Sequence, residues 1–486
     1  MRIIFCHLLL TLLACTAVAD SAPAKSTSDR PPNIVFILAD DLGVYDLHCY
    51  GRADHHTPNL DRLAAQGKRF TTAFCAQPIC SPSRAAILTG KTPARLHLTS
   101  FLPGRPDLPS QLVLHPVIEK QVPLTEKMWP HYFKAAGYAS IAIGKWHVGG
   151  KGFGPLDFGF DAEYLGKANT KPTASEGGKG EFELTAAAET FMETNKERPF
   201  VVYLAHNTPH IPYSASPERI AANAQAFEPV YAAVIESLDA SVGRLLTKID
   251  TLGIADRTIV IFTSDNGGLH VPELDHQRVT HNGPFRAGKG YGYEGGLRIP
   301  LIVRWPNHVP AGVVTDTPMV NTDWLPTLLE MTGQPAPTGL DGASIAGLLT
   351  TGQATTERSF YWHFPHYTNQ GGRPCGVIRT GQWKLIEYFD DQSVELYDLA
   401  ADTGETTNLT AANPERVSKM RAELAAWRTR NNAQSNSPNP ACSPQAFRSL
   451  YVDFDPSRFA PTTATPAQWQ AIQAWRKGMD APDKGR

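Results

Sequence analysis

Short, uninterrupted apolar runs alternate with longer amphipathic segments through the first two thirds of this sequence. The runs are rich in β-branched residues and are bounded by turn signals, at residues 34–38, 138–143, 200–204, 259–263 and 301–303. Helix-compatible segments lie between several of them, at residues 60–65, 125–136, 184–194 and 230–252. Strands that are apolar along their whole length need cover on both faces, and intervening helices provide that cover. The pattern predicts an α/β fold with a mostly parallel central sheet flanked by helices.

The pattern changes after about residue 350. Four short segments with tight turns between them read as antiparallel strands, at residues 359–362, 377–380, 383–388 and 395–399. A helical pattern follows at 414–428, and the tail from residue 431 is rich in Asn, Ser and Pro and is expected to be irregular. We therefore predict a main domain at 33–355 and a smaller C-terminal α+β subdomain at 356–486.

The N-terminus has the features of an export signal. Met1-Arg2 supplies a positive start, residues 3–17 are almost wholly apolar, and Ala17-Val18-Ala19 fits a cleavage site. We predict a signal peptide at 1–19, a flexible lead-in at 20–32, and a periplasmic or secreted protein. A bacterial lipoprotein signal with Cys15 lipidated is the alternative. No later stretch is long and apolar enough to predict a transmembrane span.

Net charge restricts the binding partners to be expected, and cysteine content restricts the disulfides. The formal net charge is -2 in 486 residues, so no global field recruits nucleic acid or anionic membrane. An anionic substrate must therefore be held by local cations. Five of the seven cysteines lie beyond the signal. Pairing of Cys49 with Cys75 and of Cys375 with Cys442 would leave Cys80 free, although four cysteines can connect in three ways.

Two of the predicted strands end in the same chemistry. Asp40-Asp41 follows the strand at 34–38, and Asp265-Asn266 follows the strand at 259–263. In parallel sheets the active site lies beyond the carboxyl ends of the strands. Carboxylate and amide oxygens that converge there suit a hard cation such as Ca²⁺ or Mg²⁺. Helix caps or turns after the strands are the alternative interpretation.

A reactive position is expected at Cys80. In the segment Cys80-Ser81-Pro82-Ser83-Arg84, the proline fits an early helical position, which places Cys80 at a helix N-terminus. The helix dipole and the free N–H groups favour an anion there. The residues alone predict either an activated thiolate or an anion pocket, and a buried structural cysteine is the alternative.

The segment Cys80-x-Pro82-Ser83-Arg84 resembles the signature of the type I sulfatases, members of the alkaline phosphatase superfamily. Further motifs resemble that family and follow in its order, over about residues 33–348: Asp40-Asp41-Leu42-Gly43, Gly144-Lys145-Trp146-His147, Thr208-Pro209-His210, Ser264-Asp265-Asn266-Gly267 and Gly288-Lys289. The resemblance implies an enzyme that hydrolyses sulfate esters. It also implies that a maturation enzyme oxidises Cys80 to Cα-formylglycine, whose hydrate carries one hydroxyl that attacks sulfur and a second that ejects sulfate.

The resemblance assigns roles residue by residue. Four residues would bind the cation together with the modified Cys80, namely Asp40, Asp41, Asp265 and Asn266. Calcium is expected, with magnesium as the alternative. Arg84 would fix the diol or the metal-bound oxygens, and Lys145 and Lys289 would hold sulfate oxygens. His147 would take a proton from the diol, and His210 would donate one to the leaving oxygen, with His206 as its competitor.

Two segments after the Cys80 motif bear on the substrate class. Residues 95–99 and 101–106 resemble the version found in sulfatases of carbohydrate-degrading bacteria, which implies a sulfated polysaccharide or glycosaminoglycan fragment as the substrate. A phosphonate or phosphate ester hydrolase of the same superfamily and a non-catalytic protein that binds sulfated glycans are the alternatives. Histidine pairs such as His55-His56 lack a convergent third ligand, so zinc is not expected. The sequence leaves the oligomeric state open.

Overall fold

The computed structural model describes residues 30–173, 176–274, 276, 278–353 and 355–480, and the chain from Pro31 onward forms one compact unit. The predicted signal peptide and Cys15 lie outside the described residues, and so does nearly all of the lead-in. Among the described residues, no helix is long and apolar enough to cross a membrane. The domain boundary near residue 355 stays a prediction.

A nine-stranded sheet forms the centre of this unit, in the order β10-β2-β8-β7-β1-β6-β4-β5, with β9 beside β2. The strands from β7 to β5 run parallel, whereas β8 runs antiparallel to both β2 and β7. Their bounds are β1 Asn33–Ala39, β2 Lys68–Phe74, β4 Ala139–Gly144, β5 Ala162–Tyr164, β6 Phe200–Ala205, β7 Thr258–Ser264, β8 Arg298–Arg304, β9 Val313–Thr315 and β10 Met319–Val320. The predicted mostly parallel sheet is confirmed. The strand at 301–303 is its antiparallel member, and β2 was not predicted.

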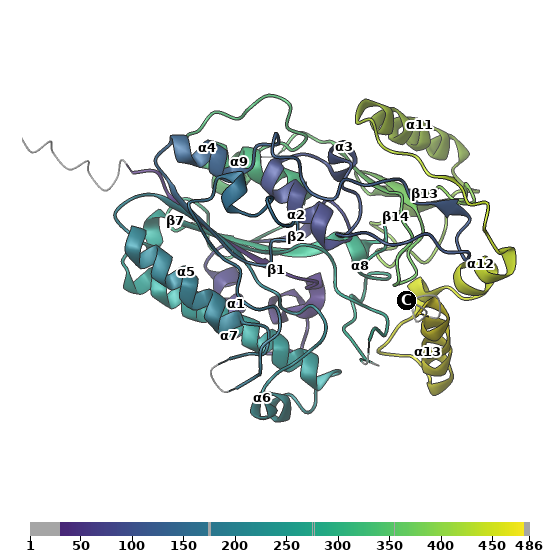
Figure 1. The fold of residues 1–486 in the computed structure, drawn as a ribbon, viewed down its shortest axis with the longest axis horizontal. Helices are drawn as coiled ribbons and strands as arrows, with labels where there is room; N and C mark the ends of the chain where they lie inside the picture. Colours follow the sequence, from purple (N-terminus) through teal and green to yellow (C-terminus); the bar gives the residue numbers. More distant parts are fainter. Residues whose placement is uncertain (1–29, 174–175, 275, 277, 354, 481–486) are drawn as a thin grey trace, which may run out of the picture. The chain divides into compact units, whose positions relative to one another are not determined.

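Helices cover both faces of the sheet (Figure 1). One face carries α1 (Pro58–Ala65), α5 (Glu181–Asn195) and α7 (Pro229–Thr251), and the other carries α2 (Cys80–Thr89), α4 (Trp129–Ala135) and α9 (Trp324–Met331). The residues of β1 alternate between the two apolar cores: Ile34, Phe36 and Leu38 face the α2 side, and Val35, Ile37 and Ala39 face the α7 side. The strand is apolar from Ile34 to Ala39 because both of its faces are buried.

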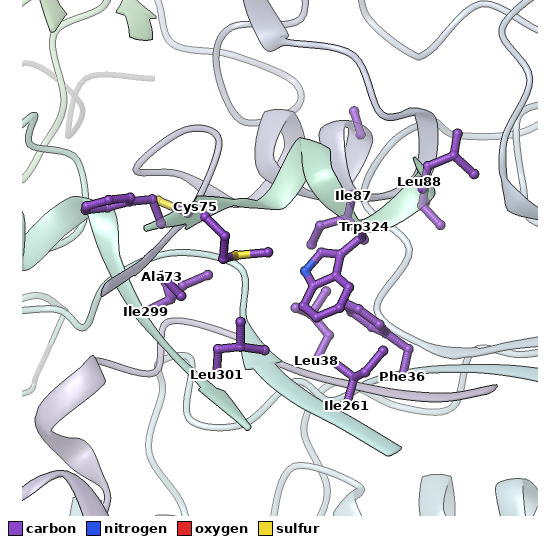
Figure 2. Close-up of a cluster of buried hydrophobic side chains, with 14 of the residues drawn as sticks. Phe36, Leu38, Ala73, Cys75, Ile87, Leu88, Ile261, Ile299, Leu301 and Trp324 are labelled. Carbon is purple, nitrogen blue, oxygen red and sulfur yellow. The ribbon is translucent and has the colours of Figure 1, made fainter. Parts of the chain in front are cut away.

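The α2 side of the sheet fixes the helix that begins with Cys80. Figure 2 shows Trp324 of α9 between Ile87 of α2 and the sheet residues Phe36 and Leu38. The rings of Phe36 and Trp324 meet edge to face with centroids 5.4 Å apart. Every residue of α2 is buried, so its position relative to β1 is set by close packing rather than by solvent-exposed contacts.

The C-terminal part contains the predicted antiparallel sheet, in the order β11-β12-β13-β14. Its strands are Ser359–Phe364, Cys375–Thr380, Trp383–Tyr388 and Val394–Asp398, and α11 (Pro414–Arg430) packs on them. The expected irregular tail is wrong, because it contains α12 (Pro444–Tyr451) and α13 (Pro466–Asp480). Ser443 caps α12 through the backbone N–H of Ala446. The apolar faces of both helices join the α7-side core, and that burial stabilises them.

Two further predictions need correction. The helix predicted at 125–136 begins only at Trp129, because Pro130 fits a first-turn position and cannot lie a full turn inside a helix. All five cysteines among the described residues are free, so the pairs Cys49–Cys75 and Cys375–Cys442 do not form. Cys75 belongs to the α2-side core, whereas Cys49 packs against the α7-side core across the sheet.

Candidate active site

The two acidic segments meet because β1 and β7 are parallel neighbours in register, with Ala39 opposite Ser264. The backbone N–H of Asp41 donates to Asp265 Oδ1 at 3.1 Å, and Asn266 Nδ2 donates to Asp41 Oδ1 at 2.8 Å. Asp40 follows directly after β1 and is buried with them. Asp41 has a φ of +65°, a left-handed conformation that aspartate tolerates better than most residues. All four predicted oxygen ligands therefore lie at one edge of the sheet.

Cys80 lies beside these carboxylates as the first residue of α2. Its Sγ is 3.5 Å from Asp40 Oδ1 and 3.7 Å from Asp41 Oδ1. Burial raises the pKa of the Cys80 thiol well above its ordinary value, because the nearby lysines only partly oppose desolvation and the carboxylates add to it. The raised pKa opposes the activated thiolate that the helix N-terminus suggested. A thiol that stays protonated is a poor nucleophile.

Arg84 lies one helical turn beyond Cys80, points at the same edge and is fully buried. Its Nε and Nη2 lie 2.9 Å and 2.8 Å from Asp265 Oδ2, and Nη2 is 3.6 Å from Asp40 Oδ1. Its Nη1 donates to the carbonyl of Lys145 at 2.8 Å. Arg84 thus connects the end of β7 with the loop after β4.

Two lysines complete the cationic side of the site. Lys145 follows β4 and donates from Nζ to Asp40 Oδ2 at 2.6 Å. Lys289 donates from Nζ to Asp41 Oδ2, also at 2.6 Å. The backbone of the Lys289 loop is anchored to the loop after β7, and Gly288 permits the close approach, because a Cβ there would lie 2.2 Å from the Gly268 carbonyl oxygen.

Three buried carboxylates thus face three cations, of which Arg84 and Lys289 are buried and Lys145 is partly exposed. Burial alone would raise the pKa of Asp40, but Lys145, His210 and Arg84 outweigh it and hold the pKa well below its usual value. The pKa of Asp41 is also lowered, mainly because Lys289 offsets desolvation. Burial raises the pKa of Asp265 to about 6 in spite of Arg84. The formal charges of these six side chains cancel, so a bound dication would leave a net positive pocket that favours an anionic ester.

The predicted histidines differ in their surroundings. His210 Nε2 is 3.7 Å from Asp41 Oδ2, and its Nδ1 is 2.7 Å from the carbonyl oxygen of Ile211. His147 Nε2 is 3.0 Å from the carbonyl oxygen of Leu102, which leaves its buried Nδ1 without a partner among the described residues. Burial and the adjacent Lys145 lower the pKa of His147 to about 3. His206 is fully buried, and desolvation lowers its pKa to about 4.

The arrangement fits a hard divalent cation. Ligand atoms of Asp40, Asp41, Cys80 and His210 all lie within 4.8 Å of one another. Asn266 Oδ1 is buried without a hydrogen-bond partner among the described residues, as expected for an oxygen that binds a cation. The carboxylate and amide oxygens are the donors that Ca²⁺ and Mg²⁺ prefer. The residues present therefore fit the cation that the sequence led us to expect.

Sequence reasoning missed two residues next to the site, Lys179 and Glu181. Both are buried, and they contact the loop that carries His210 through Pro212 and Thr208. They belong to none of the motifs above. The only local signal is the run Gly177-Gly178-Lys179-Gly180, in which a single lysine interrupts glycines before a helix. Among the aromatic residues at 361–367, Tyr361 stacks on Trp427 with ring centroids 5.1 Å apart, and Trp362 and Tyr367 are buried.

Comparisons with known proteins identify the family of this chain. Residues 32–334 match the Sulfatase family model, and residues 286–430 match the model of the N-sulphoglucosamine sulphohydrolase C-terminal region. The chain is 33% identical over 415 residues to N-acetylgalactosamine-6-sulfatase of Mus musculus, covering 78% of this chain and 75% of that protein. It is 34% identical over 479 residues to arylsulfatase A of Homo sapiens, covering 84% of this chain and 88% of that protein.

Solved structures show the same fold. The crystal structure of Ps i-CgsB has a TM-score of 0.72 and 28% identity, covering 82% of this chain and 93% of that chain. The complex of Ps i-CgsB with k-i-k-neocarrahexaose gives a TM-score of 0.70 over the same fractions. The family model matches more than half of the chain, and the relatives cover most of its length. The chain therefore belongs to the sulfatase family and is a sulfuric ester hydrolase.

Proposed function

We propose that this sulfatase removes sulfate from a sulfated carbohydrate, with a formylglycine made from Cys80 as the nucleophile and a divalent cation, calcium by preference, at the adjacent carboxylates. The observation that carries the proposal is the convergence of Cys80 with Asp40 and Asp41, each of which also pairs with a lysine. A helix N-terminus, a hard-cation site and three fixed cations at one position suit the transfer of a sulfuryl group.

Position 80 needs a group other than its thiol. Burial keeps that thiol protonated, and a thiol offers a single nucleophilic atom. When present, the hydrated formylglycine and the cation would together supply an oxygen nucleophile and neutralise the charge that develops on sulfate. Arg84 would orient that side chain from one turn further along α2, because its own guanidinium is fixed by Asp265 and by the carbonyl of Lys145.

The two lysines would bind the sulfate oxygens. Each now pairs with a carboxylate of the proposed cation site, Lys145 with Asp40 and Lys289 with Asp41. A dication would compete for the same carboxylate oxygens and weaken these pairs. The ammonium groups could then turn to an anionic ester, since lysine has three donors on a flexible stem.

Proton transfer falls to the two histidines. His210 would donate a proton to the leaving oxygen, because its Nε2 faces the site while Nδ1 contacts the Ile211 carbonyl. His147 would accept a proton from position 80 through its unengaged Nδ1. His206 is a weaker candidate for either role, because its ring makes no hydrogen bond to a described residue of the site, whereas His210 Nε2 is 3.7 Å from Asp41 Oδ2.

The substrate class rests on the relatives. They include sulfatases named for N-acetylgalactosamine 6-sulfate, and a structural neighbour solved with k-i-k-neocarrahexaose. We propose a sulfated polysaccharide or glycosaminoglycan fragment as the substrate of this chain. We also propose that the enzyme is exported to the periplasm or the medium and is matured by a formylglycine-generating enzyme, for which the signal-like residues 1–19 and the Cys80 motif are the support.

The test is to coexpress the chain with a formylglycine-generating enzyme and to analyse the peptide that contains Cys80 by mass spectrometry. We expect the aldehyde or its hydrate, together with sulfate release from a panel of defined sulfated mono- and disaccharides. An aryl sulfate and an aryl phosphonate, assayed side by side, separate a sulfatase from a phosphonate hydrolase. Cys80→Ala is the matched control. An intact thiol in an active preparation would contradict the proposed nucleophile, and faster phosphonate hydrolysis would contradict the proposed reaction.

A further inference from the structure

We propose that Lys179 and Glu181 are positioning residues that hold the loop around His210 so that its ring can deliver a proton to the leaving oxygen. The inference rests on the proposed function, because it gives His210 that task. Neither residue belongs to a motif that the sequence shares with the family. Both lie immediately before or at the start of α5, which packs on the opposite face of the sheet from α2.

The two residues fasten the loop on both sides of His210. On one side, Thr208 Oγ1 donates to Glu181 Oε1 at 2.8 Å. On the other side, Lys179 Nζ donates to the carbonyl oxygen of Pro212 at 3.0 Å. His210 thus lies midway between two fixed points, each two residues away.

Further hydrogen bonds connect Lys179 with Glu181 and connect the His210 loop with the site. The backbone N–H of Lys179 donates to Glu181 Oε2 at 3.0 Å. The Glu181 carboxylate therefore accepts one hydrogen bond from the segment before α5 and another from Thr208 in the loop that carries His210. Lys179 Nζ also donates to Asn169 Oδ1 at 2.5 Å. The carbonyl of Thr208 accepts from the backbone N–H of Asp40 at 2.9 Å, which ties the same loop to the carboxylates of the site.

The buried charge of Lys179 is unusual for a residue that only holds a loop in place. Lys179 is only 2% exposed, and its ammonium donates to two neutral oxygens, with no carboxylate in contact among the described residues. A buried ammonium without a contacting carboxylate is costly, and an asparagine or glutamine could have made the same bonds more cheaply. Burial lowers the pKa of Lys179 to about 8, and the nearby Asp40 and Glu181 oppose that fall. The Lys179 ammonium therefore lies within electrostatic range of Asp40 and Glu181.

A positioned proton donor matters most when the departing oxygen is a poor leaving group. Loss of the donor geometry should therefore slow the hydrolysis of a sugar sulfate strongly and that of 4-nitrophenyl sulfate weakly. General acid catalysis contributes about 10²–10⁴-fold, and partial misplacement should remove a fraction of it. We expect Lys179→Met to lower kcat on the sugar sulfate by roughly 10–100-fold, and on the aryl sulfate by less than about threefold.

The experiment compares Lys179→Met, Lys179→Arg and Glu181→Gln with the parent enzyme on both esters. Arginine keeps the charge and both donor directions, so it should restore part of the loss. Glu181→Gln keeps the shape of the side chain and should show the same selectivity for the sugar sulfate. It keeps the inference testable if Lys179→Met folds poorly. Lys134→Met, which alters a solvent-exposed lysine on α4, is the matched control and should behave like the parent. Near-ultraviolet circular dichroism and thermal unfolding report whether each variant is folded.

A double variant makes the test independent of fold stability. In a His210→Ala background the proton donor is absent, so adding Lys179→Met should change the rate on the sugar sulfate by less than about threefold. Equal losses on both esters, or losses that multiply in the double variant, would overturn the inference while the proposed function stands. A parent enzyme that hydrolyses neither ester would contradict the proposed function and, with it, the inference.

Discussion

Replacing Arg84 with methionine removes the cation that serves the acidic end of β7. The guanidinium is fully buried and makes two contacts shorter than 3 Å with Asp265 Oδ2, and a third with the carbonyl of Lys145. Methionine fills much of the space of the stem but leaves the Asp265 carboxylate buried without its partner. The substitution therefore isolates the charge contribution from the packing contribution.

The loss in the free energy of unfolding comes from the Asp265 carboxylate, which Arg84→Met leaves without a counter-charge. Breaking a buried ion pair by removing one partner costs about 3–5 kcal/mol, which lowers the folding equilibrium constant roughly 100-fold to several thousand-fold. The matched control is Arg244→Met. The Arg244 side chain is 43% exposed and pairs with Glu189. An exposed pair contributes about 0–1 kcal/mol. The expected difference between the two variants is thus at least 2 kcal/mol or so.

Urea unfolding followed by circular dichroism, with EDTA or with excess calcium, gives both free energies. We expect the Arg84→Met penalty to be largest in EDTA and smaller with calcium, because a bound cation would neutralise Asp265 in place of the guanidinium. Adding Asp265→Asn to Arg84→Met should recover stability in EDTA, since the orphaned charge is then gone. A penalty for Arg84→Met no larger than that of Arg244→Met, or a double variant less stable than the single one, would refute the electrostatic reasoning.

Three further outcomes are expected. Cys80→Ala should abolish sulfate release without changing the thermal unfolding midpoint by more than a few degrees; turnover at the parent rate would show that position 80 is not the nucleophile. Dialysis against EDTA should remove activity, and calcium or magnesium should restore it, as measured by aryl sulfate hydrolysis with metal analysis; full activity in a metal-free preparation would exclude the proposed cation. Burial raises the pKa of Glu181 from 4.5 to about 7, so ionisation of the unfolded chain destabilises the folded state progressively from pH 4.5 to 7. Glu181→Gln should therefore gain up to about 3 kcal/mol in its free energy of unfolding, relative to the parent, between these pH values, and a pH-independent difference would contradict the shift.

Strands that are buried on both faces can be recognised in the sequence, whereas elements that depend on distant packing cannot. The apolar strands at 34–38 and 259–263 were predictable because both of their faces are buried, which leaves a continuous apolar run in the sequence. Strand β2 was missed because its sequence, Lys-Arg-Phe-Thr-Thr-Ala-Phe, mixes polar and apolar residues near the edge of the sheet. Helices α12 and α13 were missed because their stability depends on packing against a distant core rather than on local propensity.

The chemistry of each site segment is local, and so the sequence alone determined it: a cysteine at the start of a helix, and carboxylates and an amide after two strands. Which of these segments meet is a matter of sheet order, since Asp41 and Asp265 are 224 residues apart and touch only because β1 and β7 are neighbours. The tertiary structure also decided that the cysteines stay unpaired, because the sheet separates Cys49 from Cys75. It likewise decided that Lys179 and Glu181 support His210. Such contacts arise from long-range packing, which leaves no periodic pattern in the chain.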